Sequence, residues 1–307
     1  MVRDVSVKHS TLVFRSTLPK FTYLRPSSLS ELLELKHRYG PRAALLAGGT
    51  DLLVDMKAGV RRPEYVIDIK GVKELKRLWR EGSDLFIGAA VTLKELVECD
   101  IVRKEYPILA DALRVMGDFV LRSRATLCGN VVNASPAADS APPLLVYGAR
   151  AVIASLNGVR EVPLDRFFRW VKQTVLESDE VLIGIKLPPP PPNASGEYFK
   201  CVRTSEDLAI VGIAVLAAGT RDEPLLRVAY ASVAPTPVLI DYSQMLADGL
   251  RRGSNISDMI RGIVEDVISR RVSPISDVRA TREYRIHLVK YVTAYLLRKH
   301  LGVVLNA

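Results

Sequence analysis

The first half of the chain alternates between short apolar runs and apolar residues at helical spacing. Leu29, Leu32 and Leu33 recur at helical spacing from the capping pattern Ser28-Leu-Ser-Glu31 onward, which predicts a helix that ends at Gly40. The apolar run 43–47 stops at two glycines and is typical of a buried strand that enters a tight turn. We expect further strands at 65–69, 84–91, 151–155 and 181–187, further helices from Thr92, over 107–116 and up to Tyr147, and a loop over 122–139.

A run of five prolines, Pro188 to Pro192, divides the chain. Such a run is stiff and lacks the backbone donors that a sheet needs. Beyond it the pattern predicts strands first and helices last, which favours an α+β unit. The expected strands are 198–203, 209–218 and 225–233, and the expected helices are 243–250, 254–269 and 279–301. We therefore predict an extended arm at 1–20, a first domain at 21–187, a linker at 188–196 and a second domain at 197–307.

Composition agrees with two folded domains and narrows the class of ligand. The 307 residues are 48% hydrophobic and 25% charged, which excludes wholesale disorder. The formal net charge of +9 fits an anionic ligand, an acidic partner or nucleic acid. Aromatic residues make up only 7% of the chain and are not interleaved with basic residues, so we expect no nucleic-acid site.

Cysteine and histidine usage argues against metal chemistry in this chain. The three cysteines lie far apart, which disfavours a disulfide framework and any iron–sulfur cluster of the chain's own. The four histidines lack the spacing of metal ligands. The longest apolar stretch, near 209–219, is too short to span a bilayer, and the N-terminus lacks a signal-peptide core. We expect a cytoplasmic protein, and its two glutamines and six asparagines point in the thermophile direction.

The first candidate site is the turn Ala47-Gly-Gly-Thr-Asp51, which follows the apolar run. Glycines let a ligand approach the backbone closely, and successive N–H groups at such a turn bind phosphate. Thr50 adds a hydroxyl donor. The turn matches neither the dinucleotide fingerprint nor the Walker loop, so a plain strand-to-helix connection remains an alternative for this segment alone.

The second candidate site is the segment 126–139, which is rich in small and polar residues. Thr126, Gly129 and Asn130 could complete a phosphate cradle opposite the first turn. Ser135 and Asp139 suit the hydroxyls of a ribose or ribityl chain, because a carboxylate accepts hydrogen bonds without competing donors. A polar surface loop is the alternative for this segment in isolation.

In their order and spacing, the two segments resemble the FAD-binding medium subunits of molybdenum hydroxylases. That family includes aerobic carbon monoxide dehydrogenase, aldehyde oxidoreductase and xanthine dehydrogenase. The resemblance runs from Phe21 to the C-terminus and includes 21–26, 179–188, 233–238 and 277–288.

The resemblance implies an α+β fold. Its first domain would bind FAD in the manner of vanillyl-alcohol oxidase and p-cresol methylhydroxylase, between two α+β subdomains. A smaller α+β domain with an antiparallel sheet and helices would follow. By the same resemblance, the residues expected to bind FAD are Leu45, Leu46, Ala47, Gly48, Gly49, Thr50, Asp51, Leu52, Thr126, Gly129, Asn130, Val132, Ser135, Asp139, Leu182 and Lys200.

Those positions imply distinct roles. Leu45 through Leu52 would surround the diphosphate, and Asp139 would bind a sugar-like hydroxyl of the cofactor. Leu182 and Lys200 would border the flavin ring, where an ammonium group raises the reduction potential. The chain departs from the family at Cys128, where glycine is commoner, so the backbone there must keep a negative φ or accept strain.

The resemblance also implies partners. A large molybdopterin subunit would oxidise the substrate, and a small subunit with [2Fe–2S] clusters would pass electrons to FAD and on to an external acceptor. We expect a dimer of such heterotrimers, no metal site and no catalytic side chain in this chain, and an aldehyde or carbon monoxide as substrate, with an N-heterocycle left open. Two alternatives remain: a stand-alone flavoenzyme such as an enolpyruvyl-sugar reductase, and a basic nucleotide-binding scaffold without redox activity.

Overall fold

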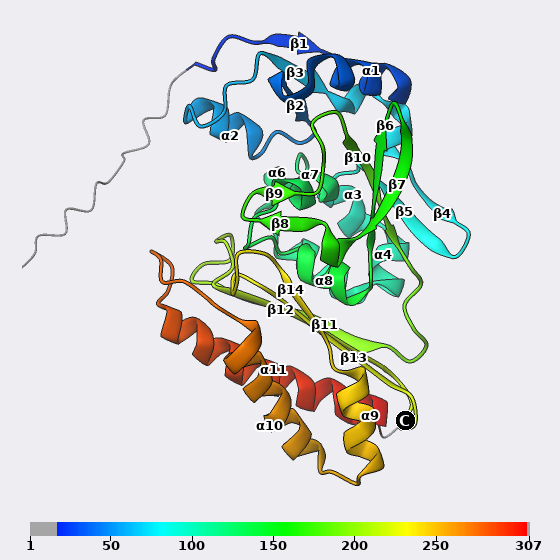
Figure 1. The fold of residues 1–307 in the computed structure, drawn as a ribbon, viewed down its shortest axis with the longest axis vertical. Coiled ribbons are helices and arrows are strands. Elements are labelled where there is room, and N and C mark those ends of the chain that lie inside the picture. The colour runs from blue at the N-terminus through cyan, green and yellow to red at the C-terminus, as the bar shows by residue number, and fades with distance from the viewer. Residues whose placement is uncertain (1–16, 306–307) are drawn as a thin grey trace, which may run out of the picture.

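The computed structural model describes residues 17–305, so most of the arm predicted at 1–20 lies outside the described residues. Three layers follow one another along the long axis of the molecule (Figure 1). A small parallel sheet lies at one end, an antiparallel sheet with short helices lies in the middle, and a second antiparallel sheet with long helices lies at the other end. Within residues 17–305, no helix is long and apolar enough to cross a membrane.

The first layer is a three-stranded parallel sheet in the order β1-β3-β2. Its elements are β1 (Thr22–Leu24), α1 (Leu29–Tyr39), β2 (Ala43–Leu46), α2 (Leu52–Lys57) and β3 (Tyr65–Asp68). The Ser28 side chain accepts a hydrogen bond from the Glu31 N–H and so caps α1. Gly40, with φ of 49°, ends the helix as predicted.

The middle layer is a five-stranded antiparallel sheet in the order β4-β5-β10-β6-β7. Its strands are β4 (Leu78–Glu81), β5 (Asp84–Gly88), β6 (Arg150–Ser155), β7 (Gly158–Pro163) and β10 (Val181–Leu187), with a small ribbon of β8 (Phe168–Trp170) and β9 (Gln173–Thr174). Its helices are α3 (Leu93–Glu98), α4 (Asp100–Glu105), α5 (Pro107–Arg114), α6 (Phe119–Arg122), α7 (Leu127–Asn133) and α8 (Ala141–Val146). Short 3₁₀ turns lie at Gly40–Arg42, Ile69–Gly71, Lys73–Lys76 and Leu164–Arg166.

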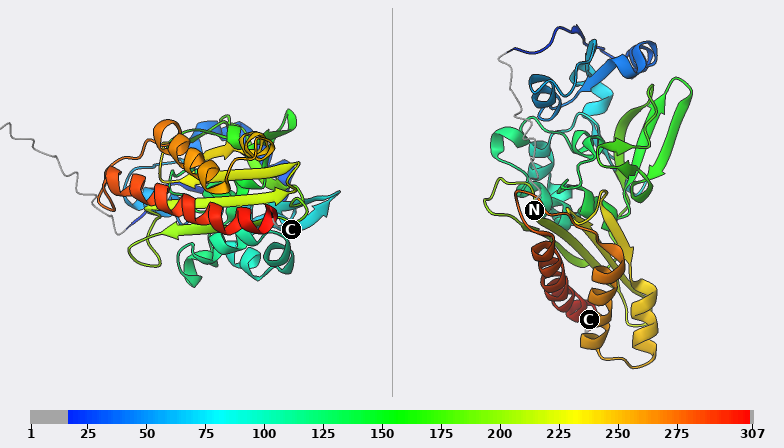
Figure 2. Two further views of the ribbon diagram at one scale, coloured as in Figure 1. Left: turned by 90° about the horizontal axis from the view of Figure 1, so that it is seen from below. Right: turned by 60° about the vertical axis from the view of Figure 1, so that its left-hand side comes forward.

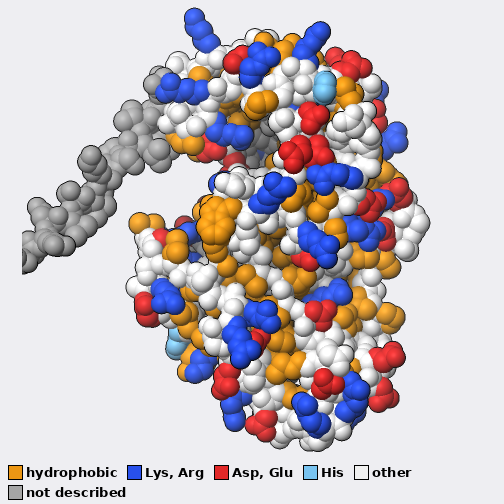
Figure 3. All heavy atoms as spheres, in the orientation of Figure 1, with side chains coloured by type: hydrophobic (Ala, Val, Ile, Leu, Met, Phe, Trp, Pro, Cys, Tyr) orange, Lys and Arg blue, Asp and Glu red, His pale blue; other side chains and the backbone are white. Residues whose placement is uncertain are grey.

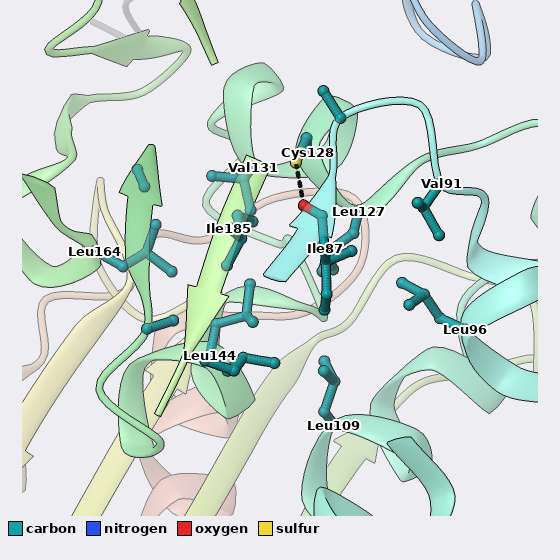
Figure 4. Packing of buried hydrophobic residues seen from close by; sticks show 14 of the residues in the cluster. Ile87, Val91, Leu96, Leu109, Leu127, Cys128, Val131, Leu144, Leu164 and Ile185 are labelled. Carbon is teal, nitrogen blue, oxygen red and sulfur yellow. Dashed lines mark hydrogen bonds between the residues drawn. The ribbon is translucent and has the colours of Figure 1, made fainter. Parts of the chain in front are cut away.

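Helix α7 corrects the prediction of a loop over 122–139. Thr126 caps this helix, because its side chain accepts a hydrogen bond from the Gly129 N–H at 3.0 Å. Leu127, Cys128 and Val131 pack beside Ile87 of β5 and Ile185 of β10 (Figure 4). Burial of these residues against the sheet overrides the weak helical signal of a segment rich in small and polar residues.

The third layer is a four-stranded antiparallel sheet in the order β11-β12-β13-β14. It contains β11 (Ser195–Cys201), β12 (Val211–Gly219), β13 (Pro224–Ala231), β14 (Val238–Asp241), α9 (Ser243–Arg251), α10 (Ile256–Asp266), a π-helical turn (Val267–Arg271) and α11 (Arg282–Leu305). The sequence pattern does not predict β14, and β11 begins inside the segment 188–196 that the pattern predicts as a linker.

Strand β12 is buried on both faces, which explains its continuous apolar run. Ile213 and Val215 belong to the core beneath α9, α10 and α11, which cover one face of the sheet (Figure 2). Ala214 and Leu216 belong to the other core, where β12 packs against α5 and α8 of the middle layer. The C-terminal sheet is therefore packed directly against the layer that carries the second candidate segment.

Candidate functional site

The first glycine turn joins the end of β2 to the start of α2. Gly49 has φ of 79°, a conformation that side chains rarely adopt. The Lys70 Nζ donates a hydrogen bond to the Ala47 carbonyl at 3.0 Å and lies 2.7 Å from Asp68. Burial opposes ionisation of Asp68, but hydrogen bonds from Lys70 and Tyr23 hold the pKa of its carboxyl below the ordinary value. An ion pair at the end of β3 thus fixes the turn.

The two candidate segments meet in space. A Cβ added to Gly48 would lie 2.3 Å from the Arg124 carbonyl oxygen and 2.8 Å from the Ala125 Cα, so only glycine permits this contact. Asn133 lies at the end of α7, and its side-chain amide donates a hydrogen bond of 2.8 Å to the Asp51 carboxylate. The turn after β2 and the segment around α7 therefore form one continuous wall.

A cavity of about 810 Å³ opens on this wall. In the space-filling view the surface is notched on its left side, between the part that contains α2 and the C-terminal part (Figure 3). Every residue predicted to bind FAD lines this cavity except Leu46, which lines a smaller cavity across the turn. They are Leu45, Ala47, Gly48, Gly49, Thr50, Asp51, Leu52, Thr126, Gly129, Asn130, Val132, Ser135, Asp139, Leu182 and Lys200.

Several other residues line the same cavity, and sequence reasoning missed them. Met116 and Leu121 come from the loop and helix before the second segment, Lys172 and Leu176 come from the β8–β9 region, and Leu208 comes from the loop after β11. These residues belong to connections that carry no motif. Only the packing of the three layers brings these connections to the wall of the cavity, so no local sequence pattern could predict their place there.

Asp139 and Lys200 form a buried ion pair at the cavity wall. The Lys200 Nζ lies 3.0 Å from Asp139 Oδ2, and the two side chains are 4% and 6% exposed. The Tyr198 hydroxyl donates to Asp139 Oδ1 at 2.6 Å, and Lys200 also donates to the Val115 carbonyl at 2.9 Å. Burial raises the pKa of the Asp139 carboxyl, and the pairing with Lys200 and Tyr198 only partly opposes that rise. Sequence reasoning had treated the carboxylate and the ammonium separately.

The remaining polar residues of the second segment are held by local hydrogen bonds. The Asn130 amide oxygen accepts from the Ser140 hydroxyl at 2.6 Å, which leaves its NH₂ group as donor. The Ser135 hydroxyl accepts from the Ala137 N–H at 3.3 Å. Val132 is 39% exposed at the rim. This donor set suits a ligand that carries phosphates and hydroxyls.

Cys128 satisfies the backbone condition that the sequence imposes. It is not among the residues with positive φ, and it is buried in α7 with its Sγ 3.9 Å from the Ile87 carbonyl oxygen. Burial raises the pKa of this thiol, so it stays protonated and unreactive. Cys128 fills the wall behind the cavity as a small apolar residue.

The site fits a flavin dinucleotide. Its volume lies within the roughly 300–1,000 Å³ typical of cofactor sites. Leu45, Leu176 and Leu182 supply apolar surface for a flat ring, while the glycine turn and the hydroxyls supply donors for a diphosphate. No group of histidine, cysteine or acidic residues within 17–305 is arranged to hold a metal ion.

Two protein families together match nearly the whole chain. The family described as the FAD binding domain in molybdopterin dehydrogenase matches residues 19–190. The family described as the CO dehydrogenase flavoprotein C-terminal domain matches residues 197–299.

Individual proteins are similar over most of their length. The chain is 33% identical over 279 residues to the putative xanthine dehydrogenase FAD-binding subunit of Escherichia coli K12, covering 89% of this chain and 93% of that one. It is 29% identical over 277 residues to the glyceraldehyde dehydrogenase medium chain of Sulfolobus acidocaldarius, covering 90% and 96%. A carbon monoxide dehydrogenase structure from Hydrogenophaga pseudoflava matches with a TM-score of 0.86 and 29% identity, over 94% of this chain and 99% of that one. The predicted α+β fold class is confirmed.

Proposed function

This chain belongs to the FAD-binding medium subunits of molybdenum hydroxylases, and we propose that it relays electrons from the [2Fe–2S] clusters of a small subunit to an external acceptor. Bound FAD supplies the reversible redox chemistry, and the protein supplies its position and electrostatic surroundings. The observation that carries the proposal is the larger cavity, which both glycine-bearing segments and Lys200 of β11 line together.

The side chains have separate tasks in this proposal. The backbone of 47–50 and the start of α7 bind the diphosphate, and the Asn130 amide donates to it. Asp139 accepts a hydrogen bond from a hydroxyl of the ribityl chain or ribose, because each of its oxygens keeps acceptor capacity beyond Tyr198 and Lys200. Leu182 and Lys200 border the ring, and Lys200 reaches it from β11 of the C-terminal sheet.

We further propose the composition of the complex. A large molybdopterin subunit oxidises an aldehyde or carbon monoxide, and the whole is a dimer of heterotrimers. The names of two relatives, a carbon monoxide dehydrogenase medium chain and a glyceraldehyde dehydrogenase medium chain, support this choice of substrate. Co-expression with the neighbouring subunits and measurement of the particle mass test the assembly, and activity with each substrate tests the chemistry.

Composition supports two more proposals, a cytoplasmic location and a thermophilic source. Mesophilic domains melt at roughly 45–65 °C. A melting temperature inside that range would contradict the thermophilic source, and fractionation of the native cells tests the location.

Flavin binding is tested on the purified chain with two variants. Gly48→Ala places a Cβ against the Arg124 carbonyl and is expected to abolish the flavin absorption that dithionite bleaches. Gly302→Ala is the matched control, because a Cβ there meets nothing within 4 Å. Thr50→Val removes one donor at nearly constant volume and should weaken FAD binding about tenfold in a protein whose circular dichroism is unchanged. A wild-type chain that takes up no flavin from an excess of FAD would overturn the proposal.

A further inference from the structure

Three polar side chains form a chain of hydrogen bonds on the wall of the larger cavity. The Lys172 ammonium donates to the side-chain oxygen of Asn133 at 2.7 Å. The side-chain amide of Asn133 in turn donates to the Asp51 carboxylate at 2.8 Å. All three residues line the larger cavity, so this chain of bonds runs beside the space proposed for the cofactor. We name these three side chains the Asn133 bridge.

The Asn133 bridge joins three separate elements. Asp51 ends the first glycine turn, Asn133 is the last residue of α7, and Lys172 lies in the turn between β8 and β9. Figure 1 shows the β8–β9 ribbon beside α7, and residues of α7 and β9 are in contact. The bridge therefore ties the first layer of the molecule to the middle layer.

The glycine turn is held along α7 at two points. Gly48 packs against the Arg124 carbonyl and Ala125, just before α7 begins. Asp51 is bonded to Asn133, where α7 ends. The first contact is close packing of backbone, whereas the second consists of hydrogen bonds at exposed positions, whose groups can bond to water instead. The Asn133 bridge is therefore the contact that opens more easily.

The backbone beside the bridge is strained. Ala134, directly after Asn133, has φ of 47°, and Lys172 has φ of 59°. Residues that carry a Cβ rarely adopt this left-handed conformation. The Lys172 N–H donates to the Ala134 carbonyl at 2.9 Å, so the two strained residues hold one another. Strain of this kind is typical of functional sites, and here it lies where two connections meet at the cavity wall.

The position of Asn133 requires a side-chain amide. Its oxygen accepts from a cation, Lys172, while its NH₂ group donates to an anion, Asp51. A hydrogen bond to a charged group is stronger than one between neutral groups. A side chain with acceptors alone, or with donors alone, could not make both bonds.

We propose that Asn133 is a positioning residue that acts through Asp51 and Lys172 and sets how slowly FAD leaves the larger cavity. This inference rests on the proposed FAD function of the site. The bridge keeps the glycine turn against α7 while the cofactor is bound, and the bridge must open before the cofactor can leave. Asn133 takes no part in the redox chemistry itself.

The test measures the release of FAD from the flavin-loaded full chain. A phosphodiesterase cleaves the released FAD to FMN, so the rise in flavin fluorescence reports the rate of release. Asn133→Ala removes both hydrogen bonds and should speed the release about tenfold, equivalent to ~1.4 kcal/mol. Asn157→Ala is the matched control, because this exposed asparagine of the β6–β7 turn lies outside the cavity, and its release rate should stay within about twofold of the wild type.

A reciprocal exchange separates the bridge from a merely structural role. Asn133→Asp keeps the acceptor for Lys172 but places a second carboxylate against Asp51, so the release should again be fast. Asp51→Asn/Asn133→Asp restores the bridge at unchanged net charge, because the new amide at position 51 donates to the new carboxylate at position 133, which still accepts from Lys172. The double variant should therefore release FAD at the wild-type rate.

Two results would overturn the inference while leaving the flavin spectrum, and with it the proposed function, intact. One is equal release from Asn133→Ala and Asn157→Ala, and the other is a double variant that releases FAD as fast as Asn133→Asp alone. If Asn133→Ala does not fold, Lys172→Met and Lys172→Arg replace it. The first removes the donor from an exposed position and should speed the release, the second keeps a donor and should not, and equal rates in this pair would count against the bridge. A wild-type chain that takes up no FAD would instead remove the proposed function and the inference with it.

Discussion

Two ion pairs, each with a buried cation, occupy different regions of the molecule and differ in how fully their carboxylates are hydrogen-bonded. Asp139 lies beside the larger cavity and accepts from Lys200 and Tyr198. Asp277 lies before α11 and accepts from the Arg279 N–H, from the Arg279 guanidinium and from Arg285. The first carboxylate has two donors and the second has more.

The difference in donors separates the pKa values. Burial raises the pKa of the Asp139 carboxyl, because two donors do not offset it. Burial also opposes ionisation of Asp277, but its several donors hold the pKa of that carboxyl well below the usual range. A buried carboxylate with spare acceptor capacity at a cavity is prepared for a ligand hydroxyl, whereas a saturated one is a structural clamp.

The largest expected effect is the loss of stability when the pair Asp277–Arg285 is broken. Arg285 is 1% exposed and donates to Asp277 and to the carbonyls of Ile210 and Ser232. Arg285→Met removes one donor from Asp277, which keeps Arg279, and leaves the buried guanidinium's two carbonyl partners, Ile210 and Ser232, without theirs. The free energy of unfolding should therefore fall by about 3–5 kcal/mol in urea titrations. The control Arg298→Met removes an exposed arginine from the same helix and should change it by less than about 0.5 kcal/mol. A loss below 1 kcal/mol for Arg285→Met would show that the pair is not a clamp.

The next largest effect is on the flavin reduction potential, through the pair Asp139–Lys200 at the larger cavity. Lys200→Met removes the ammonium beside the proposed ring position and should lower the flavin reduction potential by about 30 mV, equivalent to ~1.4 kcal/mol for a two-electron couple. The effect should shrink at acidic pH, because Asp139 then takes up a proton and restores the local charge. Lys186→Met is the control, since that lysine pairs with Glu81 and Glu161 outside the cavity. A potential that is identical in both variants would exclude the role of Lys200.

The pH dependence of stability should have opposite sign for the two carboxylates. The folded pKa of Asp139 lies above 3.8, so its contribution is fully present below pH 3.8 and is lost as the pH rises through the folded pKa. The folded pKa of Asp277 lies below 3.8, so its contribution is present above that pH and is lost as the pH falls. Urea titrations of Asp139→Asn between pH 4 and 7 should therefore show a steeper gain of stability with pH than the wild type. Parallel curves for the two proteins would contradict the raised pKa.

Sequence reasoning located what depends on local backbone chemistry. Gly48 and Gly49 identify a turn because only glycine tolerates the contact with Arg124 and a φ of 79°. The apolar run at 209–218 predicted a strand, and the structure shows that β12 is buried on both faces, which explains the run. In both cases a few consecutive residues are enough to predict the local backbone structure.

Sequence reasoning missed what depends on the assembly of distant segments. Asp139 and Lys200 belong to different layers. No local sequence pattern predicts that β11 places the Lys200 Nζ 3.0 Å from Asp139 Oδ2. Helix α7 was predicted as loop because its stabilisation comes from burial of Leu127 and Val131 against the sheet rather than from helical propensity.

The smallest expected effect isolates a single donor to Asp139. Tyr198→Phe removes the hydroxyl that donates to this carboxylate at 2.6 Å and leaves Lys200 in place. The free energy of unfolding should fall by about 0.5–1.5 kcal/mol, the net contribution of one hydrogen bond. Tyr230→Phe is the matched control in the C-terminal core, because that buried hydroxyl bonds Thr293 at 3.1 Å and touches no carboxylate. Both variants should lose similar stability, but only Tyr198→Phe should raise the pKa of Asp139 further and move the pH dependence of unfolding.

FAD should also protect Tyr198→Phe against urea more than it protects the control. The Asp139 carboxylate of this variant depends on Lys200 alone, and a hydroxyl of bound FAD would supply the missing donor. Equal protection in the two variants would show that Asp139 has no spare acceptor role, and the contrast between the two ion pairs would reduce to a difference in burial.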